Sequence, residues 1–428
     1  MSVTNLFGLS LQQKIRRRFQ GLEYSERLFF NNAAGALRLR DVLTLQQQLC
    51  GIPDYPSGQG SQARLLRDAV EYGKIRLAEL LDAPPGAIIQ DLSASRLLFS
   101  LIEAGTRLSS GNRLLVTALD HPAAIDGVKR AAALYGKDAI IVPFDPVLHS
   151  IAPADILNCL DPNTGLLVMT YTSNTTGAVL PIAEIAKQAR QINPEIAIII
   201  DGVQKIPHGP VNLSSFPADA LIMAPYKIFS ARGSGLAWCS PRLSRASRDC
   251  LLGQGVPSWE LGSQDPLSFA LMGPVGDYFL WLGRQFSSGE PPQKDREMIR
   301  QGLQRVELHE RQLLRLLLDG LEGSVGQGAI AGLRNIPGVL LYFDHPDLSK
   351  RDLIVSFSLP ALSCNEALNS FLGAQVFLSL RQQDSIYCGD ILKDYGLDWL
   401  LRVSPMHYHD EGDIWRFLKV VADIAGRQ

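Results

Sequence analysis

The 428-residue chain lacks the features that would place it in a membrane or on nucleic acid. No apolar run approaches the roughly 20 residues that a membrane-spanning helix needs. Its 41 lysines and arginines nearly balance 43 aspartates and glutamates, so the formal net charge is only −2. This balance gives no electrostatic reason to expect nucleic acid or an anionic membrane as a partner. We therefore expect a small-molecule substrate, with no nucleic acid and no membrane.

The cysteines are few and are not arranged for metal binding or for a disulfide framework. There is no Cys-x-x-Cys pair, and no histidine stands at metal-ligand spacing from a cysteine. We expect no metal and no disulfide scaffold, and most of the cysteines should be small apolar core residues. They are Cys50, Cys159, Cys239, Cys250, Cys364 and Cys388.

Between residues about 65 and 240, short apolar runs alternate with longer helical patterns. The runs are continuous in valine, isoleucine and leucine, which is typical of strands buried on both faces. Short strands separated by helices favour an α/β fold with a mostly parallel, doubly wound sheet. We expect strands at 113–117, 139–144, 165–171, 196–201, 219–224 and 235–240, and helices at 95–104, 122–136, 153–159 and 182–192.

A Gly-Glu-Pro-Pro break at 289–292 precedes a long charged amphipathic segment, which predicts a helix over about 294–322. The remainder alternates strand and helix and predicts a smaller C-terminal α/β domain. We expect strands at 338–343, 353–358 and 375–380, and helices at 364–372 and 411–425. The expected domains are an N-terminal segment, 1–35, that packs on the small domain, a large cofactor-binding domain, 36–288, and the linking helix with the small domain, 289–428.

Two polar residues follow neighbouring apolar runs of the large domain. Asp201 closes the run at 196–201, and Lys227 comes directly after the run at 220–224. Ligands of such sheets bind outside the carboxyl ends of the strands. A lysine that forms a Schiff base, with a carboxylate that keeps a pyridine nitrogen protonated, is what a pyridoxal 5′-phosphate site requires. The pair therefore predicts this cofactor.

Several further motifs occur in an order that resembles the class V aminotransferase family of fold-type I pyridoxal phosphate enzymes, and most of all its cysteine desulfurase-like branch. The resemblance extends over about residues 14–425. Its motifs are Asn-Asn-Ala-Ala-Gly at 31–35, Asp-His at 120–121, Ser-Asn-Thr-Thr-Gly at 173–177, Asp-Gly-Val-Gln at 201–204, Tyr-Lys at 226–227, Glu-Leu-Gly-Ser at 260–263 and Arg-Val-Ser at 402–404.

The resemblance implies a role for each candidate cofactor residue. Lys227 would form the Schiff base and later move the substrate's Cα proton, and His121 would stack on the cofactor ring. Asp201 would pair with the ring nitrogen. Four further candidates are Gln204 and Asn174 at the ring's phenolic edge, Tyr226 beside the lysine, and Ser263 at the phosphate of the partner subunit. This last role implies a homodimer with shared active sites.

The phosphate and the substrate have candidate residues as well. Ser93 and Ser95 open a helical stretch, and a helix N-terminus is a natural phosphate site, although an ordinary helix cap explains the same residues. The resemblance implies that Arg402 binds the substrate's carboxylate, which a guanidinium does through two parallel hydrogen bonds. It places Asn32 and Ala34 beside the substrate.

Three positions depart from the desulfurase pattern. Desulfurases have Ser-x-His before the lysine, whereas this chain has Ala-Pro-Tyr at 224–226. The lost serine removes one phosphate donor, which Ser230 or a backbone amide could replace. Tyr226 is a poorer base than histidine near neutrality, because a phenol has a pKa of about 10. Arg232 lies in Phe-Ser-Ala-Arg-Gly-Ser-Gly at 229–235, where relatives have Gly-Pro-x-Gly. It could meet a dicarboxylate or larger acidic substrate, or be a solvated loop residue.

Cys388 aligns with the nucleophilic cysteine of desulfurases, which would attack the substrate's sulfur and carry a persulfide. The flanking histidines of that pattern are replaced by Ile386 and Tyr387, and Asp390 adds a negative charge, which does not favour a thiolate. A packing cysteine is the alternative interpretation of Cys388.

The sequence thus predicts a pyridoxal phosphate enzyme that acts on an amino acid, with carbon–sulfur cleavage of cysteine or a cysteine conjugate as the leading reaction. β-Elimination would need only Lys227 and the cofactor. Transamination or epimerisation of a small amino acid metabolite is the main alternative, kynureninase-like hydrolysis a further one, and a catalytically silent scaffold relative the most remote. We expect a cytoplasmic protein, although the acid-free first 22 residues faintly resemble a mitochondrial presequence.

Overall fold

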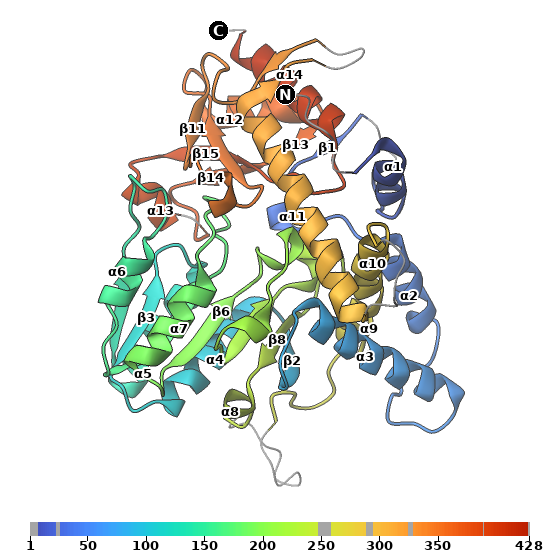
Figure 1. The fold of residues 1–428 in the computed structure, drawn as a ribbon, viewed down its shortest axis with the longest axis vertical. Coiled ribbons are helices and arrows are strands. Elements are labelled where there is room, and N and C mark those ends of the chain that lie inside the picture. The colour runs from blue at the N-terminus through green and yellow to red at the C-terminus, as the bar shows by residue number, and fades with distance from the viewer. Residues whose placement is uncertain are drawn as a thin grey trace.

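The computed structural model describes residues 7–22, 26–246, 258–287, 294–323, 328–387 and 389–426. In this part of the chain a seven-stranded sheet forms the lower body in Figure 1, and a four-stranded sheet forms the upper body. The larger sheet has the order β2-β8-β7-β6-β5-β3-β4, and only β8 runs antiparallel to its neighbours. Its strands are β2 (Ala87–Asp91), β3 (Arg113–Thr117), β4 (Asp138–Val142), β5 (Thr164–Thr170), β6 (Ala197–Asp201), β7 (Ala220–Met223) and β8 (Gly235–Cys239).

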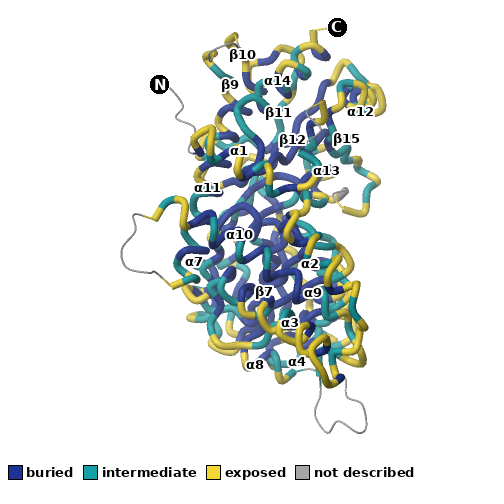
Figure 2. Tube along the Cα trace, turned by 90° about the vertical axis from the view of Figure 1, so that its right-hand side faces the viewer, coloured by how far each residue is buried: buried dark blue, intermediate teal, exposed yellow. Residues whose placement is uncertain are grey.

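Both faces of this sheet are covered by helices, which explains its continuous apolar runs. Along β3, Leu114 and Val116 pack with the helices of one face, and Leu115 packs with those of the other. Burial is complete along β5, β6, β7 and β8, and Figure 2 shows the buried trace running through the middle of the body. The first face is covered by α4 (Ala94–Leu108) and α5 (Pro122–Tyr135), and the second by α7 (Ile182–Ile192) and α10 (Met272–Arg284).

The upper body has its own apolar core, between an antiparallel sheet and two helices. The sheet order is β11-β12-β15-β14, and a short β1 pairs in parallel with β13. The strands are β1 (Leu28–Phe29), β9 (Gly320–Leu321), β10 (Ile330–Ala331), β11 (Leu340–Tyr342), β12 (Val355–Ser358), β13 (Val376–Phe377), β14 (Ser379–Gln382) and β15 (Trp399–Val403), and the helices are α12 (Cys364–Gly373) and α14 (Glu411–Ala425).

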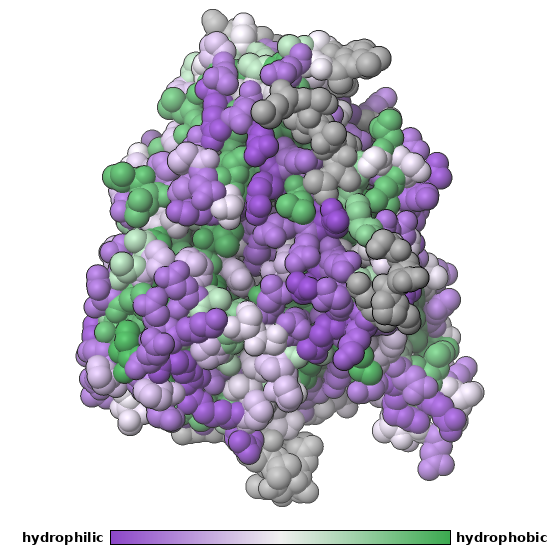
Figure 3. Space-filling model, viewed as in Figure 1, coloured by the Kyte–Doolittle hydropathy of each residue, from purple (hydrophilic) through white to green (hydrophobic). Residues whose placement is uncertain are grey.

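The long helix α11 (Asp295–Asp319) joins the two bodies and crosses the front of the molecule in Figure 1. One flank is buried, and the face that the helix crosses is largely hydrophilic in Figure 3. The other elements are α1 (Leu9–Arg17), α2 (Arg40–Cys50), α3 (Ser61–Leu80), α6 (Pro153–Asn158), α8 (Pro241–Ser244), α9 (Leu267–Ala270), α13 (Gly389–Asp394), and the 3-10 helices η1 (Asn32–Ala34), η2 (Ile206–His208), η3 (Leu213–Ser215), η4 (Pro225–Lys227) and η5 (Leu348–Lys350).

The expected α/β fold with a mostly parallel sheet is confirmed, and each expected strand and helix of the large body is present within a few residues. The single strand expected at 375–380 is wrong, because the chain forms β13 and β14, which pair with different partners. Sequence reasoning also missed β2 and β15. Among the described residues, no helix is long and apolar enough to cross a membrane. The three-part domain division remains a prediction.

Candidate active site

Four of the predicted cofactor residues lie at the carboxyl ends of neighbouring parallel strands. Asp201 is the last residue of β6, and Lys227 ends the 3-10 turn η4 that follows β7. His121 is the N-cap of α5 after β3, and Asn174 lies in the turn after β5. Parallel strands bring these ends to one edge of the sheet. Asp201 is only 5% exposed, whereas Lys227, His121 and Asn174 are partly accessible.

Lys227 has a strongly perturbed amine. Its pKa is lowered to about 7, chiefly by burial; Asp201 acts in the opposite direction, and the positive charges of Arg402, Arg381 and Arg232 contribute to the lowering. A large fraction of the amine is therefore neutral near neutral pH, which is the form that can attack a carbonyl carbon or accept a proton.

The ring of His121 is fixed by the start of its own helix. Its Nδ1 accepts a hydrogen bond from the backbone N–H of Ala123 at 3.1 Å, which leaves the proton of the neutral ring on Nε2. Burial lowers the pKa of His121, and Lys227 and Arg381 add to this effect while Asp201 opposes it. The imidazole is thus neutral, and its ring has a fixed orientation at the edge of the sheet.

Arg402 connects the two bodies at this edge. It lies on β15 and is fully buried. Its Nη1 donates to the backbone oxygen of Asn174 at 2.7 Å, and its Nη2 donates to Oδ1 of Asn31 at 3.2 Å. The register of β14 on β15 places Ser379 opposite Arg402, so Arg381, two residues further on, shares the same face of the sheet. Arg381 was missed in the sequence, because its strand was assigned wrongly.

The segment at 31–35 contacts Arg402 through Asn31, and Asn32 makes other hydrogen bonds. Asn32 donates through Nδ2 to the backbone oxygens of Phe29, at 3.1 Å, and Ser404, at 2.7 Å. Its Oδ1 accepts from the hydroxyl of Tyr408. Asn32 therefore fastens the segment to the chain after β15, and the neighbouring Asn31 is the residue that contacts Arg402.

The phosphate candidates are spread over two places. Ser93 is the N-cap of α4, where its Oγ accepts from the N–H of Arg96 at 3.2 Å, and Ser95 lies in the first turn. Gly235 lets β8 approach this turn, because a Cβ there would lie 2.2 Å from the nitrogen of Ala94. Ser263 is exposed on the single chain. The buried hydroxyl of Ser230 donates to the backbone oxygen of Leu271 at 3.4 Å.

Tyr226 and Gln204 line the same region from two sides. Gln204 is buried and donates through Nε2 to the backbone oxygen of Ala33 at 3.0 Å. The ring of Tyr226 carries the guanidinium of Arg232 on its face, 3.8 Å from the centroid, and the amine of Lys227 lies 5.8 Å from the same centroid. An aromatic face attracts cations electrostatically, so Tyr226 holds Arg232 beside the lysine.

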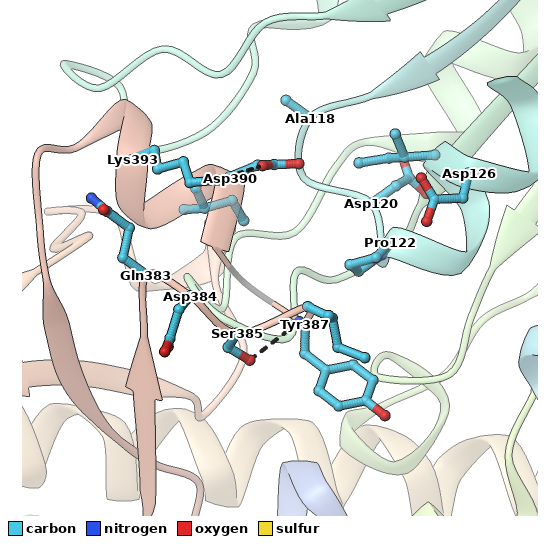
Figure 4. Close-up of a pocket in the computed structure, with 13 residues that line it drawn as sticks. Ala118, Asp120, Pro122, Asp126, Gln383, Asp384, Ser385, Tyr387, Asp390 and Lys393 are labelled. Atoms are coloured by element: carbon cyan, nitrogen blue, oxygen red, sulfur yellow. Dashed lines mark hydrogen bonds and ion pairs between the residues drawn. The ribbon is translucent and has the colours of Figure 1, made fainter.

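A cavity of about 540 Å³ opens next to His121, between the start of α5 and the segment at 383–393. Figure 4 shows Asp120, Pro122 and Asp126 on one side, and Gln383, Asp384 and Lys393 on the other. The ring centroids of Tyr387 and His121 are 5.7 Å apart. Cys388 itself lies outside the described residues, so its predicted role as nucleophile stays a prediction. Sequence reasoning also passed over the buried Asp120.

A second cavity, of about 670 Å³, lies between the two bodies, where the buried amine of Lys205 is paired with Asp352 at 3.0 Å and Glu307 at 3.3 Å. It contains none of the candidate cofactor residues. In the described part of the chain, no group of three or more histidine, cysteine, aspartate or glutamate residues is arranged to hold a metal.

Proteins of similar sequence are named as cysteine desulfurases or as cysteine desulfurase-like. The chain is 25% identical over 331 residues to a probable cysteine desulfurase of Mycobacterium leprae, and this alignment covers 75% of the chain but only 48% of that relative. It is 24% identical to a cysteine desulfurase-like protein, ustD, of Aspergillus flavus, over 93% of the chain and 87% of the relative.

Solved structures share the fold. The cysteine desulfurase CsdA of Escherichia coli matches with a TM-score of 0.78 at 17% identity, over 97% of this chain and 98% of that one. The apo cysteine desulfurase of Thermococcus onnurineus matches with a TM-score of 0.79, also at 17% identity and over the same shares. The family model of the class-V aminotransferases matches residues 28–263, which is more than half of the chain. The chain therefore belongs to the class-V aminotransferase family.

Proposed function

We propose that this protein is a pyridoxal 5′-phosphate enzyme that cleaves a carbon–sulfur bond of cysteine or a cysteine conjugate. The observation that supports the cofactor assignment is the placement of Lys227 and Asp201 at the ends of neighbouring strands. The pKa of Lys227 is lowered to about 7. When bound, the cofactor supplies an electron-accepting pyridine ring.

The residues at the sheet edge fit this cofactor. Lys227 would hold its aldehyde carbon through a Schiff base, and Asp201 would keep the ring nitrogen protonated. The oriented, neutral imidazole of His121 would cover one ring face. The first turn of α4 packs closely against β8, because Gly235 has no side chain there. This turn would offer backbone N–H groups and the hydroxyls of Ser93 and Ser95 to the phosphate.

The same residues would act on the substrate in a defined order. The guanidinium of Arg402, held by Asn174 and Asn31, would bind the α-carboxylate and fix the direction of the Cα–H bond. The neutral amine of Lys227 would then take the Cα proton, because its lowered pKa leaves it basic and uncharged near neutrality. Carbon–sulfur cleavage as the outcome is supported by the names of the relatives from M. leprae and A. flavus.

The reaction is tested by alanine release from L-cysteine, with a thiol reductant to remove sulfur from the protein. The cofactor-loaded wild type should release alanine, and Cys388→Ala should release none if Cys388 receives the sulfur as a persulfide. Cys364→Ala, a half-buried cysteine outside the site, is the matched control and should behave as wild type. Pyruvate, ammonia and sulfide from both wild type and Cys388→Ala would instead indicate β-elimination. No product from either would contradict cleavage of free cysteine. If a cysteine conjugate that carries a carboxylate also gives no product, carbon–sulfur cleavage is refuted and transamination or epimerisation is favoured.

The cofactor assignment has its own test. Lys227→Ala should remove the visible absorbance band of the purified, cofactor-loaded protein, because no other amine would hold the aldehyde. Lys205→Met changes a buried lysine outside the site and should leave the band in place. A covalent band that persists in Lys227→Ala would refute the assignment.

A homodimer and a cytoplasmic location complete the proposal. Support for the dimer comes from Ser263, which the family pattern assigns to the partner's phosphate and which is exposed on this single chain. Sedimentation of the loaded protein as a monomer would contradict the shared site.

A further inference from the structure

Arg232 is held in place beside Lys227 without a negatively charged partner. Its guanidinium stacks on Tyr226, with its carbon 3.8 Å from the ring centroid, and its Nη2 donates to the backbone oxygen of Ala34 at 3.4 Å. Among the described residues it forms no ion pair with a carboxylate. The side chain is exposed. Arg232 is thus oriented both by an aromatic face and by a carbonyl oxygen.

The charges around Lys227 are unbalanced. In the described part of the chain, Arg402, Arg381 and Arg232 all lower the pKa of its amine, and Asp201 acts in the opposite direction. In the proposed function Asp201 serves the cofactor's ring nitrogen, and Arg402 serves the substrate's α-carboxylate. The proposed function therefore assigns no ligand to Arg232 or to Arg381, and the charges at the site allow a second negative group on the substrate.

The position of Arg232 selects the substrate rather than the phosphate as its ligand. Its side chain is turned toward Ala34, in the segment that also brings Asn31 to Arg402. A Cβ on Gly35 would lie 3.1 Å from Nη2 of Arg232 and 3.3 Å from Cδ2 of Tyr226, so the glycine leaves space for this pair. Two of the phosphate candidates, Ser93 and Ser95, lie at the first turn of α4. Ser230 is closer to Arg232 in the chain, but its hydroxyl donates to the backbone oxygen of Leu271.

We propose that Arg232 binds a second anionic group on the substrate's side chain, so that the preferred substrates are amino acids with a side-chain carboxylate or a similar acid, including cysteine conjugates that carry one. A guanidinium is suited to this role because it stays charged and offers paired donors to an oxyanion. This inference rests on the proposed function, since it takes the α-carboxylate to be at Arg402.

The test compares two ligands that differ by one carboxylate, α-methylaspartate and α-aminoisobutyrate. Neither has a Cα proton, so neither undergoes proton removal, and their dissociation constants can be read from the visible absorbance of the loaded protein. Wild type should bind α-methylaspartate at least about tenfold more tightly. Arg232→Gln should reduce this preference, the ratio of the two dissociation constants, to about threefold or less. Arg232→Lys should keep part of the preference, and Arg315→Gln, an exposed arginine of α11, should keep all of it.

Other outcomes overturn the inference. Equal binding of the two ligands by wild type would show that Arg232 does not bind an acidic group on the substrate's side chain. A preference that survives in Arg232→Gln would show the same. A weaker affinity of Arg232→Gln for pyridoxal phosphate, with the ligand preference intact, would assign the arginine to the phosphate. If the protein binds no cofactor, the proposed function fails, and calorimetry with succinate and butyrate still decides the inference: tighter binding of succinate in wild type but not in Arg232→Gln supports it, and equal binding refutes it.

Discussion

Asp120 is a buried carboxyl group one residue before His121, and it illustrates how burial sets the chemistry of a single residue. It is 4% exposed, and its Oδ2 accepts from the hydroxyl of Thr117 at 2.6 Å and from the N–H of Thr117 at 3.2 Å. Its pKa is raised to about 7, chiefly by burial; the hydrogen bonds from Thr117 act in the opposite direction, and the charge of Asp201 contributes to the rise. The group therefore binds a proton in the folded protein that it would lose in the unfolded chain.

This difference predicts a pH dependence of stability. An unfolded aspartate loses its proton near pH 3.9, whereas the folded Asp120 keeps it up to about pH 7. Its contribution is therefore complete below about pH 4, decreases as the pH rises toward 7, and is lost above that value. Asp120→Asn keeps an acceptor for Thr117 but cannot titrate. Urea unfolding of the cofactor-free protein between pH 4.5 and 7.5 should show a flatter pH profile for the variant. Identical profiles would contradict the raised pKa.

The start of α4 shows how one element depends on another that is distant in the sequence. The helix begins after Ser93, and its first turn packs directly on the start of β8 at Gly235. A Cβ on Gly235 would lie 2.2 Å from the nitrogen of Ala94 and 2.4 Å from the carbonyl carbon of Ser93, and both of these are backbone atoms that cannot rotate away. The glycine therefore fixes where the helix N-terminus meets the proposed phosphate site.

Gly235→Ala should consequently displace the first turn of α4. We expect a loss of about 1–3 kcal/mol in the free energy of unfolding, as is typical of overpacking, together with weaker binding of pyridoxal phosphate. Gly373→Ala, at the end of α12, is the matched control, because a Cβ there has open space and stability should be unchanged or slightly increased. Denaturant unfolding and cofactor titration measure both effects. A variant that matches the control in both would show that β8 does not position this turn.

Across the whole molecule, the buried carboxylate of Glu310 on α11 connects the two bodies. Its Oε2 lies 2.6 Å from Nδ1 of His208, which follows β6, and its Oε1 accepts from the N–H of His407, which follows β15, at 2.9 Å. Burial alone would raise the pKa of Glu310, but His208 and His407 lower it to about 2. The carboxylate therefore stays charged and holds three distant segments together.

Glu310→Ala should leave His208 and the N–H of His407 buried without their acceptor. We expect a loss of about 3–5 kcal/mol in the free energy of unfolding, the usual result of removing one partner of a buried charged pair. Glu71→Ala, an exposed glutamate of α3, should change it by no more than about 0.5 kcal/mol. Denaturant unfolding compares the two. A loss below about 1 kcal/mol for Glu310→Ala would mean that water replaces the carboxylate.

The sequence by itself determined the secondary structure of the large body and the edge of the sheet where Asp201, Lys227 and His121 lie. It could do so because strand burial, helix periodicity and the direction of parallel strands all depend on residues that are neighbours in the sequence. The tertiary structure alone decided which side chains share the site. The pairing of β14 with β15 places Arg381 on the same face of the sheet as Arg402. Asn31 contacts Arg402, and Arg232 stacks on the ring of Tyr226. The tertiary structure also buries Asp120 and so raises its pKa. Most of these contacts join residues far apart in the chain, and all depend on packing and burial, which no local pattern encodes.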